Sequence, residues 1–288
     1  GTISVPATHP GPGYPASSGY AAGHAAPSAE GGVDFLKFDF CYAAPGSDPV
    51  ALIRRMGQAL RATGREIVYS VCEWGVNRPW EWGAAVGAHM WRTARDIHDS
   101  WESVSQIGFG LQADLHPYAG PGRWNDPDML VVGMKDRGHV ASGGLTEAEY
   151  ASHFALWCLL AAPLMIGCDV RSMDDFTRSL LADADLIGIN QDSLGRQGYR
   201  VGAAVDHAPA ETWAKPLADG SWAVGFFNTG DIDQRLMSIG WQQLGLSLDQ
   251  RADVYHLATE ETHPGVTGTF TTQVESHGAH VIRVTPAR

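Results

Sequence analysis

Short apolar runs alternate with amphipathic stretches over the first two thirds of the chain. The run at 33–39 predicts a strand, and residues 49–63 carry apolar side chains at helical spacing. This helix is expected to begin after a cap at Ser47 or Asp48 and to end at Gly64. Strands that alternate with helices indicate a mainly parallel sheet built from βα units.

Further elements are predicted on the same grounds: strands at 65–73 and 163–169, a weak helix at 22–30 that contains Pro27, and a helix at 145–162. The last helix has the spacing of a capping box, with Thr146 three residues before Glu149. Residues 163–169 read "PLMIGCD" and are expected to form a buried strand. Roughly six βα units fit into the chain up to about residue 195.

The pattern changes after residue 199, where apolar and polar residues alternate in short runs. The segment "ETWAKPLADGSWAVGFFNTG" predicts two strands joined by an Asp-Gly turn. Further strands are predicted in three segments: "ADVYHLAT", "GTFTTQV" and "AHVIRVTP". We therefore expect a domain of βα units over residues 1–195 and a small antiparallel β domain over residues 200–288.

Charged residues interrupt the apolar strands at their carboxyl ends. Lys37 and Asp39 share one face of the strand at 33–39, just before a loop. In a barrel of parallel strands, inward side chains at this end line the active site. Other predicted strands or apolar segments place acids in the same way: Glu73, on the expected face of Tyr69 and Val71, and Asp126, Asp128 and Asp169. Several carboxylates are thus expected to converge on one rim.

Tryptophans lie close to these acids in the sequence: Trp74, Trp80, Trp82, Trp91 and Trp124. Carboxylates bind hydroxyl groups and exchange protons, and aromatic rings stack on the faces of sugars, so the combination favours a carbohydrate site. Simpler explanations exist for single residues. Arg92 and Asp96 could be a surface pair on a helix, Asp126 and Asp128 could form an Asx turn, and a tryptophan is usually core.

Several long motifs resemble glycoside hydrolase family 27: "VDFLKFDFCY", "YSVCEWG", "WRTARDIHDSW", "GRWNDPDMLVVG" and "INQDSLGRQG". The resemblance runs from about residue 11 to the C-terminus. It implies a (β/α)8 TIM-type barrel followed by a C-terminal antiparallel β-sandwich domain. It also implies a retaining double displacement, in which Asp39 is the nucleophile and Asp96 the general acid/base. Residues at positions that contact the sugar are, by the same resemblance, Lys37, Glu73, Arg92 and Asp128. Trp74, an aromatic residue next to Glu73, is a further candidate for substrate binding.

The chain also departs from the family pattern. By comparison with the family it is expected to lack the first two to three βα units, and residues 1–5 stand in the place of the third strand. About six strands cannot close a barrel of this type without open edges. Gly11 stands where the family usually has the disulfide partner of Cys41, so this thiol is expected to be unpaired. The sequence fits either a partial chain or a shortened homologue that repairs its barrel, for example by forming a homo-oligomer.

The leading functional hypothesis is a retaining exo-glycosidase that acts on terminal α-D-galactosyl residues of an oligosaccharide or glycoconjugate. Alternatives are a β-L-arabinopyranosidase or an α-N-acetylgalactosaminidase of the same family, or a catalytically silent sugar-binding fragment. No cofactor is expected, and the scattered histidines argue against a metal site and against a metal hydrolase.

Composition narrows the choice of partners and compartment. The net charge of -12 argues against nucleic acid as a partner, and the hydrophobic content of 44% is enough for a sizeable core. No apolar run has the length of a membrane span, and no signal peptide is recognised. A secreted or extracellular location is expected from the habit of the family alone.

Overall fold

The computed structural model describes residues 2–6, 18–41, 43, 45–201 and 209–287. The chain forms two compact units, which are described separately below. The first unit comprises Gly1–Asp96 and Pro121–Pro127, and the second comprises Ile97–Gly120 and Asp128–Arg288. The predicted boundary between residues 195 and 200 therefore lies inside the second unit.

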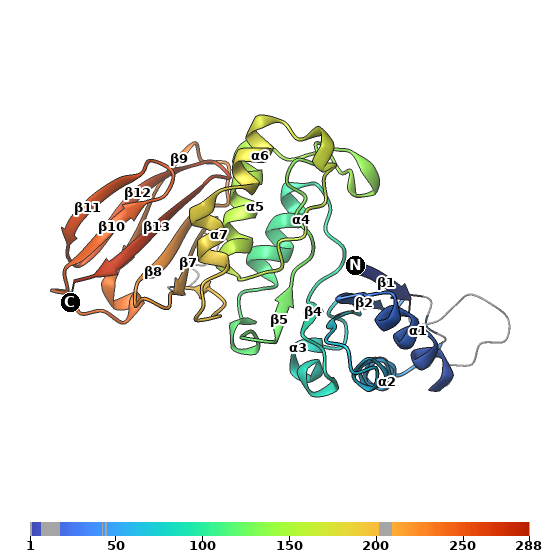
Figure 1. The fold of residues 1–288 in the computed structure, drawn as a ribbon. Coiled ribbons are helices and arrows are strands. Elements are labelled where there is room, and N and C mark those ends of the chain that lie inside the picture. The colour runs from blue at the N-terminus through green and yellow to red at the C-terminus, as the bar shows by residue number, and fades with distance from the viewer. Residues whose placement is uncertain (1, 7–17, 42, 44, 202–208, 288) are drawn as a thin grey trace. The chain divides into compact units, whose positions relative to one another are not determined.

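A five-stranded parallel sheet forms the centre of the first unit, with the strands in chain order (Figure 1). Its elements are β1 (Thr2–Pro6), α1 (Ser18–Glu30), β2 (Phe35–Asp39), α2 (Pro49–Ala62), β3 (Val68–Cys72), α3 (Pro79–Trp82), the 3-10 turn Ala84–Val86, β4 (Met90–Arg92) and β5 (Trp124–Asp126). The predicted strands at 1–5, 33–39 and 65–73 are confirmed, as are both N-terminal helices.

Helix α2 covers one face of this sheet. It begins where Asp48 accepts hydrogen bonds from the backbone N–H groups of Val50 and Ala51, as one of the two predicted caps requires. Its buried residues Ile53, Met56 and Leu60 pack against side chains of β2 and β3: Leu36, Phe38, Tyr69 and Val71. The alternation along β2 then leaves Lys37 and Asp39 on the other face, where they are half-buried.

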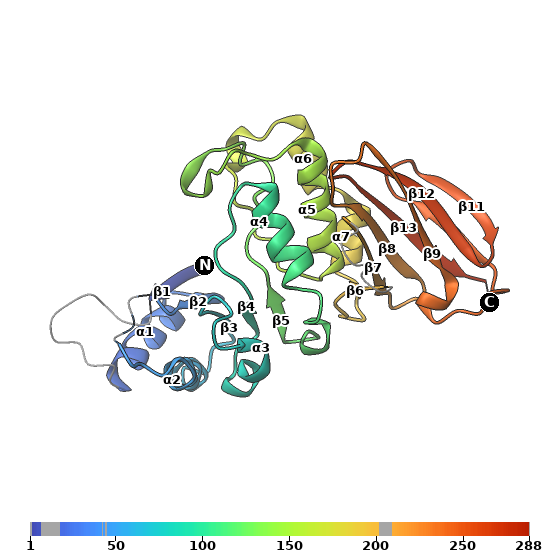
Figure 2. The same cartoon turned by 180° about the vertical axis from the view of Figure 1, so that it is seen from behind.

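The second unit contains the remaining helices (Figure 2). They are α4 (Trp101–Ser105), the π-helical turn Gln106–Gly110, α5 (Glu147–Leu159), α6 (Asp175–Leu181), α7 (Ala184–Asn190) and the short 3-10 turns His116–Tyr118, Gly138–Val140, Val170–Ser172 and Trp241–Leu244. The capping box at Thr146 and Glu149 is confirmed. The predicted end of this helix at residue 162 was wrong: Ala161 has a φ of 51°, and the helix stops at Leu159.

Residues 163–169 do not form the buried strand that was predicted. Their strand character is limited to one parallel bridge between Leu130 and Ile166, supported by two backbone hydrogen bonds. Met165 and Ile166 are 45% and 47% exposed. The apolar run therefore indicates a segment that can pair with another strand. It does not determine whether other elements of the fold pack on its side chains and bury them.

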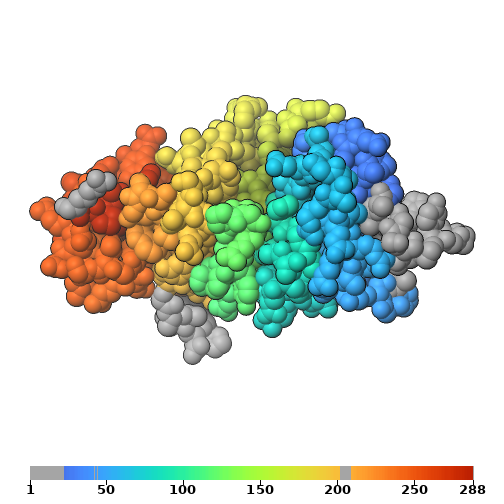
Figure 3. Space-filling model, turned by 60° about the horizontal axis from the view of Figure 1, so that its bottom comes forward, coloured from blue at the N-terminus to red at the C-terminus, as the bar shows by residue number. Residues whose placement is uncertain are grey.

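Antiparallel strands complete the second unit as two packed sheets, seen as one orange and red body in Figure 3. The larger sheet has the order β11-β10-β13-β8-β7-β6, and the smaller one pairs β12 with β9. The strands are β6 (Tyr199–Arg200), β7 (Ala210–Pro216), β8 (Trp222–Asn228), β9 (Gln234–Gly240), β10 (Ala252–His256), β11 (Glu261–Val266), β12 (Thr269–Glu275) and β13 (Ala279–Pro286). The hairpin turn at Asp219-Gly220 is confirmed, with a φ of 86° at the glycine.

Three of these strands were missed in the sequence: the two-residue strand β6, and β9 and β11. Strand β11 contains Pro264 and Gly265, which normally argue against a strand, but it lies at the edge of its sheet, where proline is tolerated. Strand β9 exposes Leu236 to solvent, which breaks the expected alternation of apolar and polar side chains. Among the described residues, no helix is long and apolar enough to cross a bilayer.

Candidate active site

Charged side chains from β2 and β4 lie near the thiol of Cys72, the last residue of β3. Residues pair in parallel register, so Lys37 lies beside Ser70 and Asp39 beside Cys72. Burial raises the pKa of Cys72 to about 12, while the positive charges of Arg92 and Lys37 lower it and the negative charge of Asp39 raises it. The Arg92 guanidinium also approaches the Cys72 sulfur at 4.0 Å. Asp39 and Arg92 therefore lie beside Cys72, and Lys37 lies two residues before Asp39 on the same face of β2.

A second cysteine links Asp39 to Asp96. The Cys41 thiol donates a hydrogen bond to Oδ1 of Asp39 at 3.5 Å. Burial raises the pKa of this thiol to about 11, and the negative charges of Asp39 and, more weakly, Asp96 add to the effect. Asp39 ends β2 and Asp96 follows the end of the parallel strand β4, so both carboxylates lie at the same end of the sheet. All four cysteines are free thiols, as expected for Cys41.

Arg92 is the last residue of β4 and is buried, whereas the side chain of Asp96 is 67% exposed. Nη2 of Arg92 donates to Oδ1 of Asp96 at 3.2 Å and to the carbonyl oxygen of Ala94, also at 3.2 Å. Residues 93–98 form no helix, so the alternative of a helical surface pair was wrong. Arg92 instead holds the segment that carries Asp96 against the strand end.

The predicted orientation of Glu73 was wrong in one respect. Tyr69 and Val71 face α2, and the Tyr69 hydroxyl donates to the carbonyl oxygen of Ile53 at 3.0 Å. Glu73 does not continue this face, because it lies beyond the end of β3 in a tight turn. Its side chain is buried, and burial raises its pKa, an effect opposed by hydrogen bonds from Asn77.

Trp74 follows Glu73 in this turn, has a φ of 57° and is half-buried. The other tryptophans have different roles. Trp91 is fully buried in the core, and its indole N–H donates to Oδ1 of Asn125 at 2.8 Å, so it is not available as a sugar platform. The indole of Trp82 donates to the carbonyl oxygen of Asn77 at 2.8 Å. Of the five tryptophans, Trp91 is thus core and Trp82 supports the turn.

Asp128 belongs to the second unit and is buried. Its Oδ2 atom accepts from the backbone N–H of Ile97 at 2.9 Å, and its Oδ1 atom accepts from that of Met129 at 2.7 Å. Asp169 does not join a rim of acids: it caps a short 3-10 turn and forms an ion pair with Arg171 at the surface. Among the described residues, no group of three or more His, Cys, Asp or Glu side chains could hold a metal ion.

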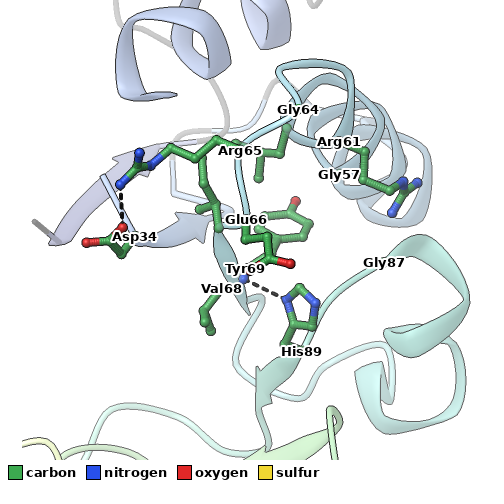
Figure 4. A pocket seen from close by; sticks show the side chains of 12 residues that line it. Asp34, Gly57, Arg61, Gly64, Arg65, Glu66, Val68, Tyr69, Gly87 and His89 are labelled. Atoms are coloured by element: carbon green, nitrogen blue, oxygen red, sulfur yellow. Dashed lines mark hydrogen bonds and ion pairs between the residues drawn. The ribbon is translucent and has the colours of Figure 1, made fainter. Parts of the chain in front are cut away.

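A pocket of about 570 Å³ in the first unit is lined by other residues (Figure 4). Its lining includes Asp34, Arg61, Arg65, Val68 and His89, which precede or begin the strands or end α2. Asp39, Glu73 and Arg92 lie at or beyond the opposite ends. Strand β3 has five residues, so the two ends are about 15 Å apart. This pocket is therefore separate from the candidate active site.

Comparison with known proteins explains the arrangement. The family model for alpha galactosidase A matches residues 4–192, and that for the alpha galactosidase C-terminal beta sandwich domain matches residues 207–284. The chain belongs to the alpha-galactosidase family, glycoside hydrolase family 27. The parallel sheet and the C-terminal antiparallel sheets accordingly confirm the predicted fold class, an incomplete TIM-type barrel followed by a β-sandwich domain. The parallel sheet has five strands among the described residues, where roughly six βα units were expected.

Alpha-galactosidases from several organisms are similar to the chain. The protein from Cyamopsis tetragonoloba is 39% identical over 272 residues, which is 94% of this chain and 62% of the relative. That from Coffea arabica is 40% identical over 272 residues, or 94% of this chain and 68% of the relative. The crystal structure of alpha-galactosidase I from Mortierella vinacea superposes with a TM-score of 0.85 at 26% identity, covering 98% of this chain and 76% of that one. The chain thus spans about two thirds of these alpha-galactosidases.

Two residues around this family's candidate site were not found by sequence reasoning. Cys72 lies beside Asp39 and Arg92, and the alternation of "VYSVC" could have placed it there once the register with β2 was known. Asn77 contacts Glu73 from within the same turn, four residues later in the chain. A short polar side chain in a loop carries no signal of its own, because loops are generally polar.

Proposed function

We propose that the chain acts as a retaining exo-glycosidase that hydrolyses terminal α-D-galactosides. The observation that carries the proposal is that Asp39 ends β2 and Asp96 follows the end of β4, two strands of one parallel sheet. Two carboxyl groups close together are what a double displacement needs. The substrate class is supported by the names of the similar proteins, which are alpha-galactosidases.

Asp39 is proposed as the nucleophile. Its carboxylate attacks the anomeric carbon, the glycosidic C–O bond breaks, and the departing oxygen takes a proton from Asp96. In the second step, Asp96 takes a proton from water, the water oxygen bonds to the anomeric carbon, and the Asp39 carboxylate leaves. Exposure of Asp96 to solvent suits a group that must meet both the leaving group and water.

The remaining residues are proposed to bind and orient the sugar. Lys37 and Arg92 supply positive charge and hydrogen-bond donors beside Asp39. Glu73 is proposed to accept a hydrogen bond from the sugar near its 2-position, and Trp74 to offer an aromatic face. Asp128 is proposed to act close to the acid/base, and its bond to the residue after Asp96 supports such a role.

The first test is hydrolysis of p-nitrophenyl α-D-galactopyranoside by the chain and by its Asp39→Ala variant. We expect the variant to lose at least about 10³-fold in kcat, because no covalent intermediate can form. Azide should restore turnover in the variant by replacing the missing carboxylate. Asp34→Ala is the matched control, since Asp34 precedes the opposite end of the same strand.

Activity in a folded wild type that Asp39→Ala leaves unchanged would rule out the proposed nucleophile. A folded wild-type chain without activity would rule out the proposal that this chain is a glycosidase. Parallel assays with p-nitrophenyl β-L-arabinopyranoside and p-nitrophenyl α-N-acetylgalactosaminide would show whether the sugar specificity is the proposed one.

A further inference from the structure

The two oxygen atoms of the Glu73 carboxylate have different surroundings. Oε2 accepts hydrogen bonds from the backbone N–H of Asn77 at 2.8 Å and from its side-chain Nδ2 at 2.6 Å. Oε1 is buried and finds no hydrogen-bond partner among the described residues. A buried carboxylate oxygen without a donor is unfavourable by several kcal/mol at most sites, so such an atom points to a donor that arrives with a ligand.

The turn after β3 fixes Asn77 relative to Glu73. Trp74 and Gly75 both have positive φ, at 57° and 75°, and the backbone N–H of Val76 donates to the Glu73 carbonyl oxygen at 3.2 Å. The Trp82 indole anchors the Asn77 carbonyl oxygen from α3. The Asn77 side chain itself is exposed, so its amide can be changed without opening a cavity in the core.

We infer that Asn77 is a positioning residue: it holds Oε2 of Glu73, so that Oε1 can accept the hydrogen bond near the sugar's 2-position that the proposed function assigns to Glu73. This inference rests on the proposed function and deepens it. A carboxylate offers only acceptors, so it requires a donor from the ligand. With a 2-deoxy sugar, Oε1 would stay unpaired.

Asn77 also acts on the charge of Glu73. Burial raises the pKa of this carboxyl, and the two Asn77 hydrogen bonds oppose the rise by favouring the ionised form. Without the side-chain donor, Glu73 should take up a proton at a higher pH. A protonated Glu73 carboxyl accepts a hydrogen bond from the sugar hydroxyl less well than the ionised carboxylate does.

The test compares Asn77→Leu, which keeps the size of the side chain but removes its donor, with Val76→Ala. Val76 is the matched control because it belongs to the same turn and is 65% exposed. The substrates are p-nitrophenyl α-D-galactopyranoside and its 2-deoxy analogue. We expect Asn77→Leu to lower kcat/KM at least about 10-fold on the galactoside and at most about 2-fold on the 2-deoxy sugar.

A second readout needs no substrate. The pKa of Glu73 is followed by ¹³C NMR of its carboxyl carbon in wild type, Asn77→Leu and Asn77→Ser, and should rise in Asn77→Leu. Ser retains a hydroxyl donor and should give a smaller rise. These variants are compared by thermal unfolding, so that a loss of fold is not mistaken for a loss of positioning.

An equal loss on both substrates, or a Glu73 pKa that is the same in all three proteins, would overturn the inference while leaving the proposed function intact. An inactive but folded wild type contradicts the proposed function instead, and with it the assignment of Oε1 to a sugar hydroxyl. In that case the NMR titration alone still decides whether Asn77 controls the Glu73 carboxylate.

Discussion

The Asp128 carboxylate accepts a hydrogen bond from the backbone N–H of Ile97, 31 positions earlier in the chain and directly after Asp96. The other carboxylate oxygen accepts from the N–H of Met129, so both oxygens are used by backbone groups. Asp128, which the family resemblance places among the sugar contacts, thus also anchors the backbone. Loss of this anchor should affect both the fold and the segment that carries the proposed acid/base.

Asp128→Asn is therefore expected to lower the free energy of unfolding by about 1–3 kcal/mol, because an amide can accept from only one of the two N–H groups. Turnover should fall with it. Urea unfolding measures the first effect and the p-nitrophenyl galactoside assay the second. Asp175→Asn is the control: that carboxylate is 96% exposed and should change stability by less than about 0.5 kcal/mol. Equal effects of the two substitutions would contradict the anchor.

Replacement of Asp96 should separate substrates by their leaving groups. Asp96→Asn removes the proposed proton donor, so kcat on an alkyl α-galactoside is expected to fall by about 10²–10⁴-fold. α-Galactosyl fluoride, which needs little protonation, should lose far less in the first step. Glu66→Gln serves as the control, since Glu66 is exposed beside the opposite end of β3. A loss of the same size on both substrates would argue against an acid/base role.

The turn that carries Glu73 depends on Gly75. A Cβ atom there would lie 2.2 Å from the Thr93 carbonyl oxygen, and the residue has a φ of 75°. Gly75→Ala should reduce the free energy of unfolding by about 3 kcal/mol or more, from a clash added to backbone strain. Gly122 has the same φ of 75° with no atom near its would-be Cβ, so Gly122→Ala should cost about 1 kcal/mol. Similar values for both variants would show that the close approach to Thr93 does not matter.

A buried amine makes stability depend on pH. Lys215 on β7 is fully buried, its Nζ has no hydrogen-bond partner among the described residues, and burial lowers its pKa to about 8, partly offset by Asp192. The unfolded chain binds this proton up to about pH 10.4, so the free energy of unfolding should increase from about pH 8 to pH 10. The gain from this one group is about 3 kcal/mol.

Lys215→Met should remove that rise and be more stable than wild type at pH 7, because a similar side chain without charge fills the same space. Chemical denaturation at pH 7, 8.5 and 9.5 checks both statements. Lys135→Met is the control, since Lys135 pairs with Asp174 at the surface. If the pH dependence survives in Lys215→Met, another group is responsible for it.

Local features of the fold could be predicted because they depend on neighbours in the chain. Asp48 begins α2, Thr146 and Glu149 form their capping box, and Asp219-Gly220 turns a hairpin. Each of these uses hydrogen bonds or dihedral angles within a few residues. The same holds for Lys37 and Asp39, whose common face follows from the alternation along one strand.

By itself, the sequence determined these elements, the family, and the presence of charges at strand ends. Only the tertiary structure decided that Glu73 leaves the face of Tyr69 and Val71, that residues 163–169 stay half exposed, and that Asp128 binds Ile97. These outcomes depend on where a strand ends, on what packs beside it, and on contacts between residues far apart in the chain. Periodicity carries no information about such long-range partners, because it records only which face of an element is apolar.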